Sequence, residues 1–251
     1  MLTDRVILVT GGSRGIGRAC VLEAVRQGAR VVFCSRQDGP DSRAVEAEAV
    51  ALAGPGAAIG VAADIADEAS VLKMFEVVHN RLGALDGVVN NAAISREQLL
   101  VSMTTEEWDS VLAANLTGSF LVARESIRSF LAHNRKGSIV SIGTLSQYGI
   151  SGNASYATSK GGLLGLTRQI ASQYGSQGIS SNMVVSGYVK TALSASVPPA
   201  AAQALIDGSS LRRAGLPEEI AAVVMFLLSP EAAAVNGQVI HATGGLREVP
   251  A

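Results

Sequence analysis

The sequence predicts the α/β class: one domain built on a doubly wound, seven-stranded parallel sheet with helices on both faces. Two observations predict it. Short runs rich in β-branched residues alternate with longer stretches of helical period along the chain, as in sheets whose parallel strands are joined by helices. The first run, RVILVT, leads through closely spaced glycines directly into a helical stretch, which is the strand-to-helix connection that such a sheet requires.

Seven strands are predicted as short apolar runs, and helical stretches lie between them. The strands span residues 5–10, 29–35, 57–62, 85–90, 137–143, 179–185 and 237–242. Helical stretches begin near Gly15, Asp41, Asp67, Thr104, Ala154 and Pro217, several of which suit a helix start. Thr104 precedes Glu107 by three residues, the spacing of a capping box.

The segment 192–210 departs from this alternation. It is rich in Ala, Ser and Pro and lacks a regular strand or helix pattern, so a mobile lid is predicted at about residues 190–212. The sequence contains no internal repeat and no low-complexity linker. A single domain is therefore expected over residues 1–251.

Composition and charge exclude several classes of protein. The 251 residues are 48% hydrophobic and 16% charged, with a net charge of −1, so neither nucleic acid nor an anionic membrane is an expected partner. The absence of a long apolar run and of a leader-like start predicts a cytoplasmic protein.

Cys20 and Cys34 are expected to be buried, reduced thiols. The histidines, His79, His133 and His241, are scattered and have no other ligand type at metal-binding spacing, so no metal site is predicted.

A glycine-rich turn follows the first predicted strand. Residues 10–17 read Thr-Gly-Gly-Ser-Arg-Gly-Ile-Gly, a GxxxGxG spacing. Glycine permits a tight turn and lets a pyrophosphate approach the backbone, and the helix that follows directs free N–H groups and its positive dipole end at the anion. The turn is therefore predicted to bind the diphosphate of a dinucleotide.

Four motifs together resemble the short-chain dehydrogenase/reductase family, whose fold is a single Rossmann-type domain. The GxxxGxG turn is the first. Residues 90–93, Asn-Asn-Ala-Ala, close the fourth predicted strand where that family usually has Asn-Asn-Ala-Gly, Asn115 lies in the next helix, and Tyr156 with Lys160 forms Tyr-x-x-x-Lys. Their order and spacing cover nearly the whole chain. The resemblance implies an oxidoreductase that uses a nicotinamide cofactor.

The end of the second predicted strand, Cys34-Ser35-Arg36, indicates which nicotinamide is used. An acidic residue there commonly holds the ribose hydroxyls of NAD, whereas cationic groups suit the 2′-phosphate of NADP. Arg36 and Arg14 can converge on that phosphate through charge-assisted hydrogen bonds. NADPH is therefore predicted; Asp38 is the acidic alternative, but it falls in the loop beyond the strand.

The resemblance also implies contacts to the rest of the cofactor. Asp64 and Ile65 would lie at the adenine, while Val189 and Thr191 would hold the nicotinamide carboxamide. Ser186-Gly187 stands where the family usually has Pro-Gly. The full predicted cofactor set is Gly11, Ser13, Arg14, Gly15, Ile16, Gly17, Arg36, Asp64, Ile65, Asn91, Ala92, Tyr156, Lys160, Val189 and Thr191.

Tyr156 and Lys160 lie four residues apart in a stretch of helical period and so share one helix face. A tyrosine titrates near pH 10, about three units above neutrality. A nearby ammonium group favours the phenolate, and a shift of that size needs about 4 kcal/mol. The pair is therefore predicted to transfer protons, with Lys160 also holding the ribose hydroxyls as the resemblance implies.

Two further catalytic residues are implied by the resemblance. The family places a serine that binds the substrate oxygen just after the fifth strand; here Thr144 stands there, twelve residues before Tyr156, with Ser146 as a second candidate and Ser141 as a weaker one. Thr144 could instead bond its own turn backbone.

Asn115 interrupts a helical stretch as a poor helix former, and in the family this residue holds a water that relays protons to the lysine.

Residues 95–100 and the stretch that begins at Thr104 are most similar to the 3-oxoacyl-[acyl-carrier-protein] reductases of the family. This similarity implies reduction of a 3-oxoacyl thioester; a free alcohol or ketone, a polyketide intermediate, and a non-catalytic cofactor-binding relative remain alternatives. The resemblance implies an acyl carrier protein as partner. It also implies a homotetramer, formed through the helices after the fourth and fifth strands and through the last strand. Residues 247–251 would lie near that interface. Candidate carrier-binding residues are Arg128, Arg135, Lys136 and Arg168, and candidate pocket residues are Gln147, Tyr148 and Tyr188.

Overall fold

The structure, a computed structural model, describes residues 1–149 and 152–246, and it confirms the predicted parallel sheet. The sheet order is β3-β2-β1-β4-β5-β6-β7, and every adjacent pair is parallel. All predicted strand ends lie within two residues of the observed ones. The strands are β1 (Val6–Thr10), β2 (Arg30–Ser35), β3 (Ala58–Ala62), β4 (Gly87–Asn90), β5 (Gly137–Thr144), β6 (Ile179–Ser186) and β7 (Val239–Ala242).

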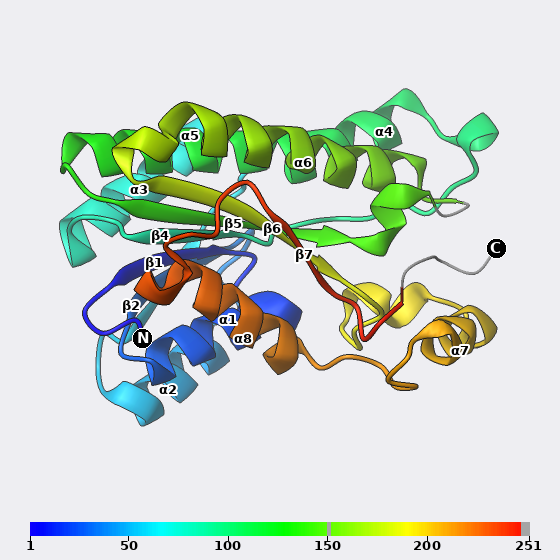
Figure 1. Ribbon diagram of the computed structural model, residues 1–251, viewed down its shortest axis with the longest axis horizontal. Coiled ribbons are helices and arrows are strands. Elements are labelled where there is room, and N and C mark those ends of the chain that lie inside the picture. Colours follow the sequence, from blue (N-terminus) through cyan, green and yellow to red (C-terminus); the bar gives the residue numbers. More distant parts are fainter. Residues whose placement is uncertain (150–151, 247–251) are drawn as a thin grey trace.

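Helices cover both faces of the sheet (Figure 1). One face carries α1 (Gly15–Arg26), α2 (Pro40–Ala53) and α8 (Pro217–Leu228); the other carries α3 (Glu68–Leu82), α4 (Thr105–Leu112), α5 (Gly118–Ala132) and α6 (Ala154–Tyr174). Alternate residues of β1 belong to two cores, with Ile7 in the first and Leu8 in the second. Burial on both faces explains why the strands are near-continuous apolar runs. Short 3₁₀ helices lie at Leu100–Ser102, Leu145–Tyr148, Gly175–Gln177, Leu193–Ser196 and Pro230–Ala232.

The predicted helix starts are confirmed, two of them with their capping side chains. Asp67 precedes α3 and accepts hydrogen bonds from the backbone N–H groups of Ala69 and Ser70. Thr104 and Glu107 form the predicted capping box of α4. Between α4 and α5 the chain makes a π-helical turn, Ala113–Thr117, with Asn115 at its centre. The helix interruption predicted at Asn115 is therefore present as a local widening of the helix, which continues into α5.

The segment after β6 contains a helix that the sequence did not predict. Residues 193–196 form a 3₁₀ turn and α7 spans Pro199–Gly208 at the far end of the molecule from the chain's N-terminus (Figure 1). α7 begins with a proline in its first turn and has no buried residue. The prolines at 198 and 199 indicated a loop, whereas Pro199 stands in the first turn of a helix, where proline is tolerated.

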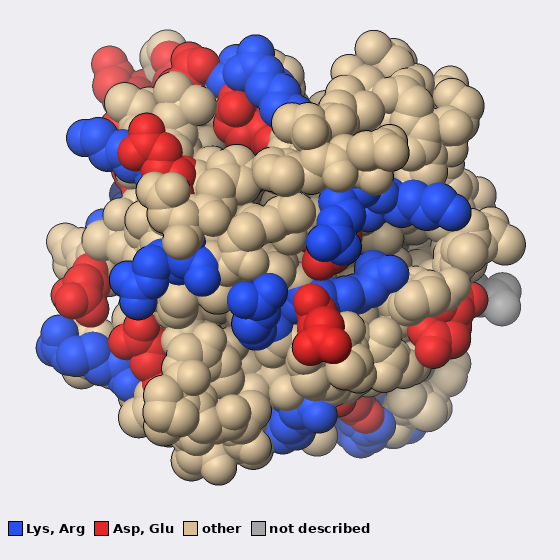
Figure 2. Space-filling view, turned by 90° about the vertical axis from the view of Figure 1, so that its left-hand side faces the viewer, with Lys and Arg blue, Asp and Glu red and all other residues tan. Residues whose placement is uncertain are grey.

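Acidic and basic side chains are interspersed on the end of the molecule that Figure 2 shows, where the amino ends of the strands lie. Arg135 and Lys136 immediately precede β5 and belong to this end, and Arg135 pairs with Asp86 at 3.1 Å. The strands' carboxyl ends lie at the opposite edge, a full strand length away. Arg135 and Lys136, two of the predicted carrier-binding residues, therefore lie at the end of the sheet opposite the carboxyl ends of the strands. Arg128 pairs with Glu125 at 2.8 Å, and Arg168 is exposed on the second half of α6.

Two expectations about polar side chains have different outcomes. Cys20 and Cys34 are free and buried, as predicted. His79 and His133 are not scattered in space, because α3 and α5 bring their ring centroids to 5.6 Å. Burial and the neighbouring His133 lower the pKa of His79.

Within the described part of the chain, no helix combines the length and the apolarity that a membrane span requires. The expected position of residues 247–251 lies outside the described residues.

Candidate active site

The glycine turn joins β1 to α1 and leaves no room for side chains. Gly11 and Gly15 have φ values of 66° and 56°, a left-handed region that glycine adopts without strain. A Cβ on Gly17 would lie 2.1 Å from the carbonyl oxygen of Gly11, so this glycine is required for α1 to pack against the turn. Among the side chains that the structure describes, none caps the N-terminus of α1. The helix therefore presents free N–H groups at this edge, as an anion-binding turn does.

The hydroxyl of Thr10 and the amide of Asn91 hold this turn against β4. Thr10 Oγ1 accepts hydrogen bonds from the backbone N–H groups of Asn91 and Ala92, both at 3.0 Å, and donates to Val89 O. Asn91 Nδ2 donates to Thr10 O at 2.8 Å and to Gly11 O at 3.1 Å. The side chain of Asn91 is thus engaged in shaping the turn. Thr10 is not among the residues predicted from the sequence, although a hydroxyl at the end of the first predicted strand was the available signal.

A cleft of about 500 Å³ runs along this edge of the sheet. Most of the predicted cofactor residues line it: Gly11, Ser13, Arg14, Gly15, Ile16, Arg36, Asp64, Ile65, Asn91, Ala92 and Thr191. Four predicted members do not line it, namely Gly17, Tyr156, Lys160 and Val189. Gly17 is buried beneath the turn, and Val189 lines a separate cavity of about 170 Å³ between α7 and α8.

Arg14 and Arg36 are exposed on the cleft wall, and within residues 1–149 and 152–246 neither forms an ion pair. Asp38, the acidic alternative, lies outside the cleft lining and pairs with Arg43 at 3.7 Å. The wall at the end of β2 is therefore cationic.

Just after β3, an acidic and an apolar residue form the cleft wall. Asp64 is exposed, and its Oδ1 accepts from Ala66 N at 3.0 Å in a local turn. Ile65 is buried and packs against Gly118, where an added Cβ would lie 2.8 Å from the isoleucine side chain. An apolar residue beside an acidic one gives this wall both a packing surface and a hydrogen-bond acceptor.

Asn115 connects the cleft wall to α6. Its side chain is fully buried; Oδ1 accepts from Ile94 N at 2.8 Å, and Nδ2 donates to Ile94 O and to Ser159 Oγ. Ser159 Oγ in turn donates to Tyr156 O at 2.8 Å. These bonds tie the loop after β4 to the helix turn that carries Tyr156, and Ser159 is a connecting residue that the motif comparison did not identify.

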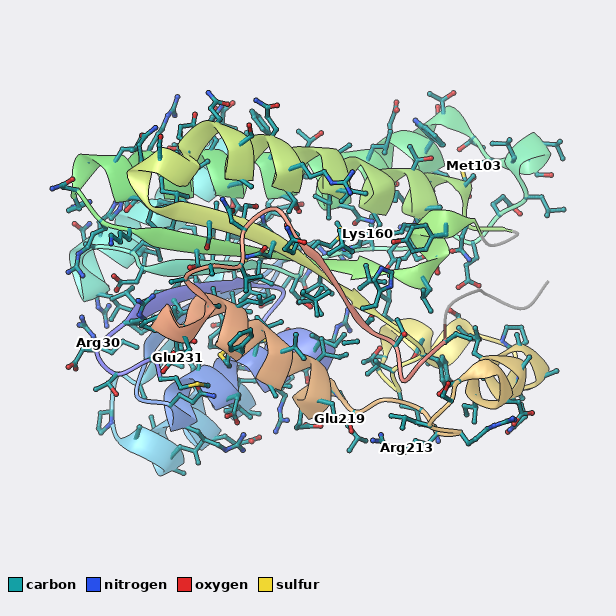
Figure 3. All side chains as sticks on the ribbon, in the orientation of Figure 1. Arg30, Met103, Lys160, Arg213, Glu219 and Glu231 are labelled. Carbon is teal, nitrogen blue, oxygen red and sulfur yellow. The ribbon has the colours of Figure 1, made fainter. Side chains whose placement is uncertain are left out.

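Lys160 lies beneath α6, between the helix and the sheet (Figure 3). It is 2% exposed, and its Nζ donates to Ile142 O at 2.8 Å and lies 5.9 Å from the centre of the Tyr156 ring. Burial lowers the pKa of Lys160 to about 8 and raises the pKa of Tyr156 to about 12. The direction for Tyr156 is opposite to the one that the lysine alone would give, because desolvation of the phenolate outweighs the attraction of an ammonium group that points at a carbonyl.

Thr144 is the last residue of β5, and its hydroxyl has local partners. Oγ1 accepts from Ser146 N at 3.2 Å and donates to Ser146 Oγ at 3.3 Å. Thr144 N donates to Gln147 Oε1, which completes a capping box for the 3₁₀ turn Leu145–Tyr148. The turn-capping role that the sequence left open for Thr144 is thus present. Ser141 is buried within β5, and Ser146 is half-buried.

Comparisons with known proteins agree with this architecture. A family model described as Enoyl-(Acyl carrier protein) reductase matches residues 11–247. The chain is 37% identical to the 3-oxoacyl-[acyl-carrier-protein] reductase FabG of Aquifex aeolicus, with 98% of each chain covered. It is 34% identical to the 3-oxoacyl-[acyl-carrier-protein] reductase MabA of Mycobacterium bovis, over 97% of this chain and 93% of the relative.

Solved structures give the same result. A levodione reductase superimposes with a TM-score of 0.91 at 32% identity, with 98% of both chains covered. A short chain dehydrogenase from Bacillus anthracis gives a TM-score of 0.89 at 27% identity, again over 98% of both chains. Sequence relatives, structural neighbours and the arrangement of turn, cleft and Tyr-x-x-x-Lys helix agree, and the chain belongs to the short-chain dehydrogenase/reductase family of oxidoreductases.

Proposed function

We propose that this protein reduces a ketone to a secondary alcohol with NADPH, and that its substrate is a 3-oxoacyl thioester. The observation that carries the proposal is the position of Tyr156 and Lys160 on the face of α6 that packs over the end of β5. The Asn115 bonds link this helix to the wall of a cleft with an anion-binding turn. A proton donor and a dinucleotide cleft at one sheet edge are the parts that carbonyl reduction requires.

The cleft suits NADPH. Free N–H groups at the start of α1 and the glycines beneath them fit a diphosphate, and Arg14 and Arg36 offer two guanidinium groups to a 2′-phosphate. Asp64 and Ile65 would border the adenine, and Thr191 the nicotinamide. When bound, NADPH supplies the hydride for the carbonyl carbon.

The chain's own residues would then supply and position the proton. With a pKa raised to about 12, Tyr156 is protonated at neutral pH and so enters the reaction as an acid. Lys160, with a pKa lowered to about 8, titrates close to neutrality and is suited to resupply a proton to the phenol. Asn115 is proposed to fix the helix turn between them, and Thr144 to orient the substrate oxygen.

A thioester substrate is supported by the names of the sequence relatives and by the apolar surroundings of the catalytic helix. Leu145, Leu163, Met183, Val185 and Leu246 form a small core beside the end of β5, and Leu205 of α7 packs on it half-buried. α7 and the turn before it are proposed to act as the substrate lid. Glu97 and Ser196 meet across the cleft at 2.9 Å, so the lid and the loop after β4 are joined above it.

A free ketone is the second candidate substrate. The likeness to levodione reductase supports it, since that name describes a reductase of a small diketone. The carrier-protein partner and the homotetramer remain proposals. A tetramer would cover three exposed large apolar residues, Phe120 and Leu131 on α5 and Phe226 on α8. Light scattering of the purified protein tests the assembly.

The proposed function is tested by the rate of NADPH oxidation on a panel of substrates. The panel contains an acetoacetyl thioester, a cyclic diketone, a crotonyl thioester that offers a C=C bond, and NADH in place of NADPH. We expect the acetoacetyl thioester with NADPH to give the highest kcat/KM. Faster reduction of the diketone would select the second candidate, and reduction of the crotonyl thioester alone would contradict carbonyl reduction.

A further inference from the structure

The end of β5 holds a side-chain amide with an unused donor. Gln147 lies in the 3₁₀ turn Leu145–Tyr148, and its Oε1 accepts from Thr144 N at 3.4 Å. Its Nε2 is buried and has no hydrogen-bond partner among residues 1–149 and 152–246. A buried donor without a partner is costly to the fold, so each such group in a native protein calls for a reason.

The orientation of this amide is determined by its neighbours. Because a backbone N–H must meet an acceptor, the atom facing Thr144 N is the oxygen, and Nε2 takes the other position. Gly143 provides the space: a Cβ there would lie 2.9 Å from Gln147 Oε1 and 3.0 Å from Met183 Sδ. A capping bond on one side and a glycine beneath it hold the amide in place.

The amide lies at the same level of the sheet as the catalytic phenol. After β5 the chain passes through the 3₁₀ turn and returns in α6, which packs against both. Lys160 Nζ donates to Ile142 O, and Tyr156, one helical turn earlier, lies about 6 Å nearer the carboxyl end of the strand. At about 3.3 Å per strand residue, that is the level of Thr144, whose N–H bonds the Gln147 amide.

To orient the substrate oxygen, Thr144 has to redirect a hydroxyl proton that it directs at a neighbouring side chain in this structure. Its hydroxyl proton is directed at Ser146 Oγ, and the same oxygen accepts from Ser146 N. A second donor at this point would leave the cap intact. We propose that Gln147 is a further catalytic residue, whose Nε2–H donates a hydrogen bond to the carbonyl oxygen that Tyr156 protonates. This proposal rests on the proposed function.

Such a bond would stabilise the negative charge that gathers on this oxygen as the C=O π electrons move onto it. The oxygen gains its proton from the Tyr156 hydroxyl. The amide proton stays on Nε2 throughout, so Gln147 needs no regeneration between turnovers.

The variant Gln147→Glu separates donation from capping. A carboxylate can still accept from Thr144 N, so the turn remains capped, but it has no N–H and places a negative charge beside the developing oxyanion. Removal of one such donor lowers kcat about 100-fold or more in other enzymes, and we expect a loss of this size at pH 8 with the Kd for NADPH unchanged. Gln169→Glu is the matched control, because Gln169 is exposed on the same helix as Tyr156 and bonds only Gln173 among the described residues.

The pH profile distinguishes a catalytic donor from a structural one. As pH falls through the pKa of the introduced glutamic acid, its protonated form regains a donor, and the ratio of variant to wild-type kcat should rise. A second variant, Gln147→Met, lacks both functions and should show a low kcat ratio at every pH. Near-wild-type kcat for Gln147→Glu, or a reduced kcat with a flat ratio across pH, would overturn the proposal. Failure of the wild-type protein on every carbonyl would instead overturn the proposed function itself.

Discussion

Two turns at the same edge of the sheet, one after β1 and one after β5, are built in different ways. The turn after β1 is made by the backbone: Gly17 has no room for a Cβ, and Asn91 bonds backbone oxygens. The turn after β5 is made by side chains, with the Thr144 hydroxyl and the Gln147 amide capping it. A backbone-built site tolerates few residue types at its glycines, whereas a side-chain-built site can exchange one hydroxyl or amide for another. The first should therefore define the cofactor, and the second the substrate.

The largest effect is expected from Tyr156→Phe, which removes the proposed acid from the helix α6 that packs beside the second turn and leaves the first turn untouched. Loss of general acid catalysis costs about 100- to 10,000-fold in kcat, while the Kd for NADPH, measured by fluorescence titration, should stay within about twofold of wild type. Tyr174→Phe is the control, since Tyr174 lies on the same helix at its opposite end. A simultaneous loss of NADPH binding would show that Tyr156 is structural.

Gly17→Ala tests the backbone-built turn. The added Cβ would lie 2.1 Å from Gly11 O, so the turn must shift, at a cost of about 1–3 kcal/mol. NADPH affinity should fall about 10- to 100-fold. Gly165→Ala on α6 has open space around its Cβ and should leave NADPH affinity unchanged. Equal affinities of the two variants would mean that the turn does not hold the cofactor.

Arg36→Ala sharpens the assignment of the cofactor. Losing a charge-assisted contact to the 2′-phosphate costs about 1.5–3 kcal/mol, so the KM for NADPH should rise about 10- to 100-fold while the KM for NADH changes little. Arg43→Ala removes a nearby cation that is paired with Asp38 instead and serves as the control. A parallel rise of both KM values would indicate a structural role for Arg36.

The buried lysine predicts a pH dependence of stability. The folded-state pKa of Lys160 is lowered from 10.5 to about 8, so between these pH values the unfolded chain binds more protons and this group favours folding increasingly as pH rises. In urea titrations, the free energy of unfolding of wild type relative to Lys160→Met should increase by about 2 kcal/mol from pH 7.5 to pH 9.5. A difference that stays constant over this range would contradict burial of the charge.

The smallest effect is expected at the lid. The Ser196–Glu97 bond is exposed, so its contribution should be about 1 kcal/mol or less. In a double-mutant cycle of Ser196→Ala and Glu97→Ala, we expect each single variant to raise KM a few-fold and the double variant to add nothing further. Additive effects would show that the two residues do not act through one bond.

The sheet and the glycine turn were predictable because each leaves a periodic or steric trace in the sequence. Strands buried on both faces appear as apolar runs, and the glycines appear wherever a Cβ would collide, as at Gly17. Thr104 and Asp67 marked helix starts through hydrogen bonds to residues close by in sequence.

Other features depend on contacts between distant segments, which leave no such trace. α7 begins at a pair of prolines, which indicated a loop and not the first turn of a helix. His79 and His133, 54 positions apart in the sequence, meet only when α3 packs on α5. The pKa of Tyr156 depends on how deeply its phenol is buried, which the Tyr-x-x-x-Lys spacing does not encode.

The most direct test of the central claim is the transfer of label from deuterated cofactor. The protein is incubated with NADPH that carries deuterium at both hydrogen positions of nicotinamide C4 and with acetoacetyl thioester, and the product is examined by mass spectrometry alongside the Tyr156→Phe variant. We predict a 3-hydroxyacyl thioester that carries one deuterium at C3, formed by wild type and not by the variant. Oxidation of the cofactor without labelled alcohol, or equal labelling by the variant, would contradict carbonyl reduction with Tyr156 as the acid.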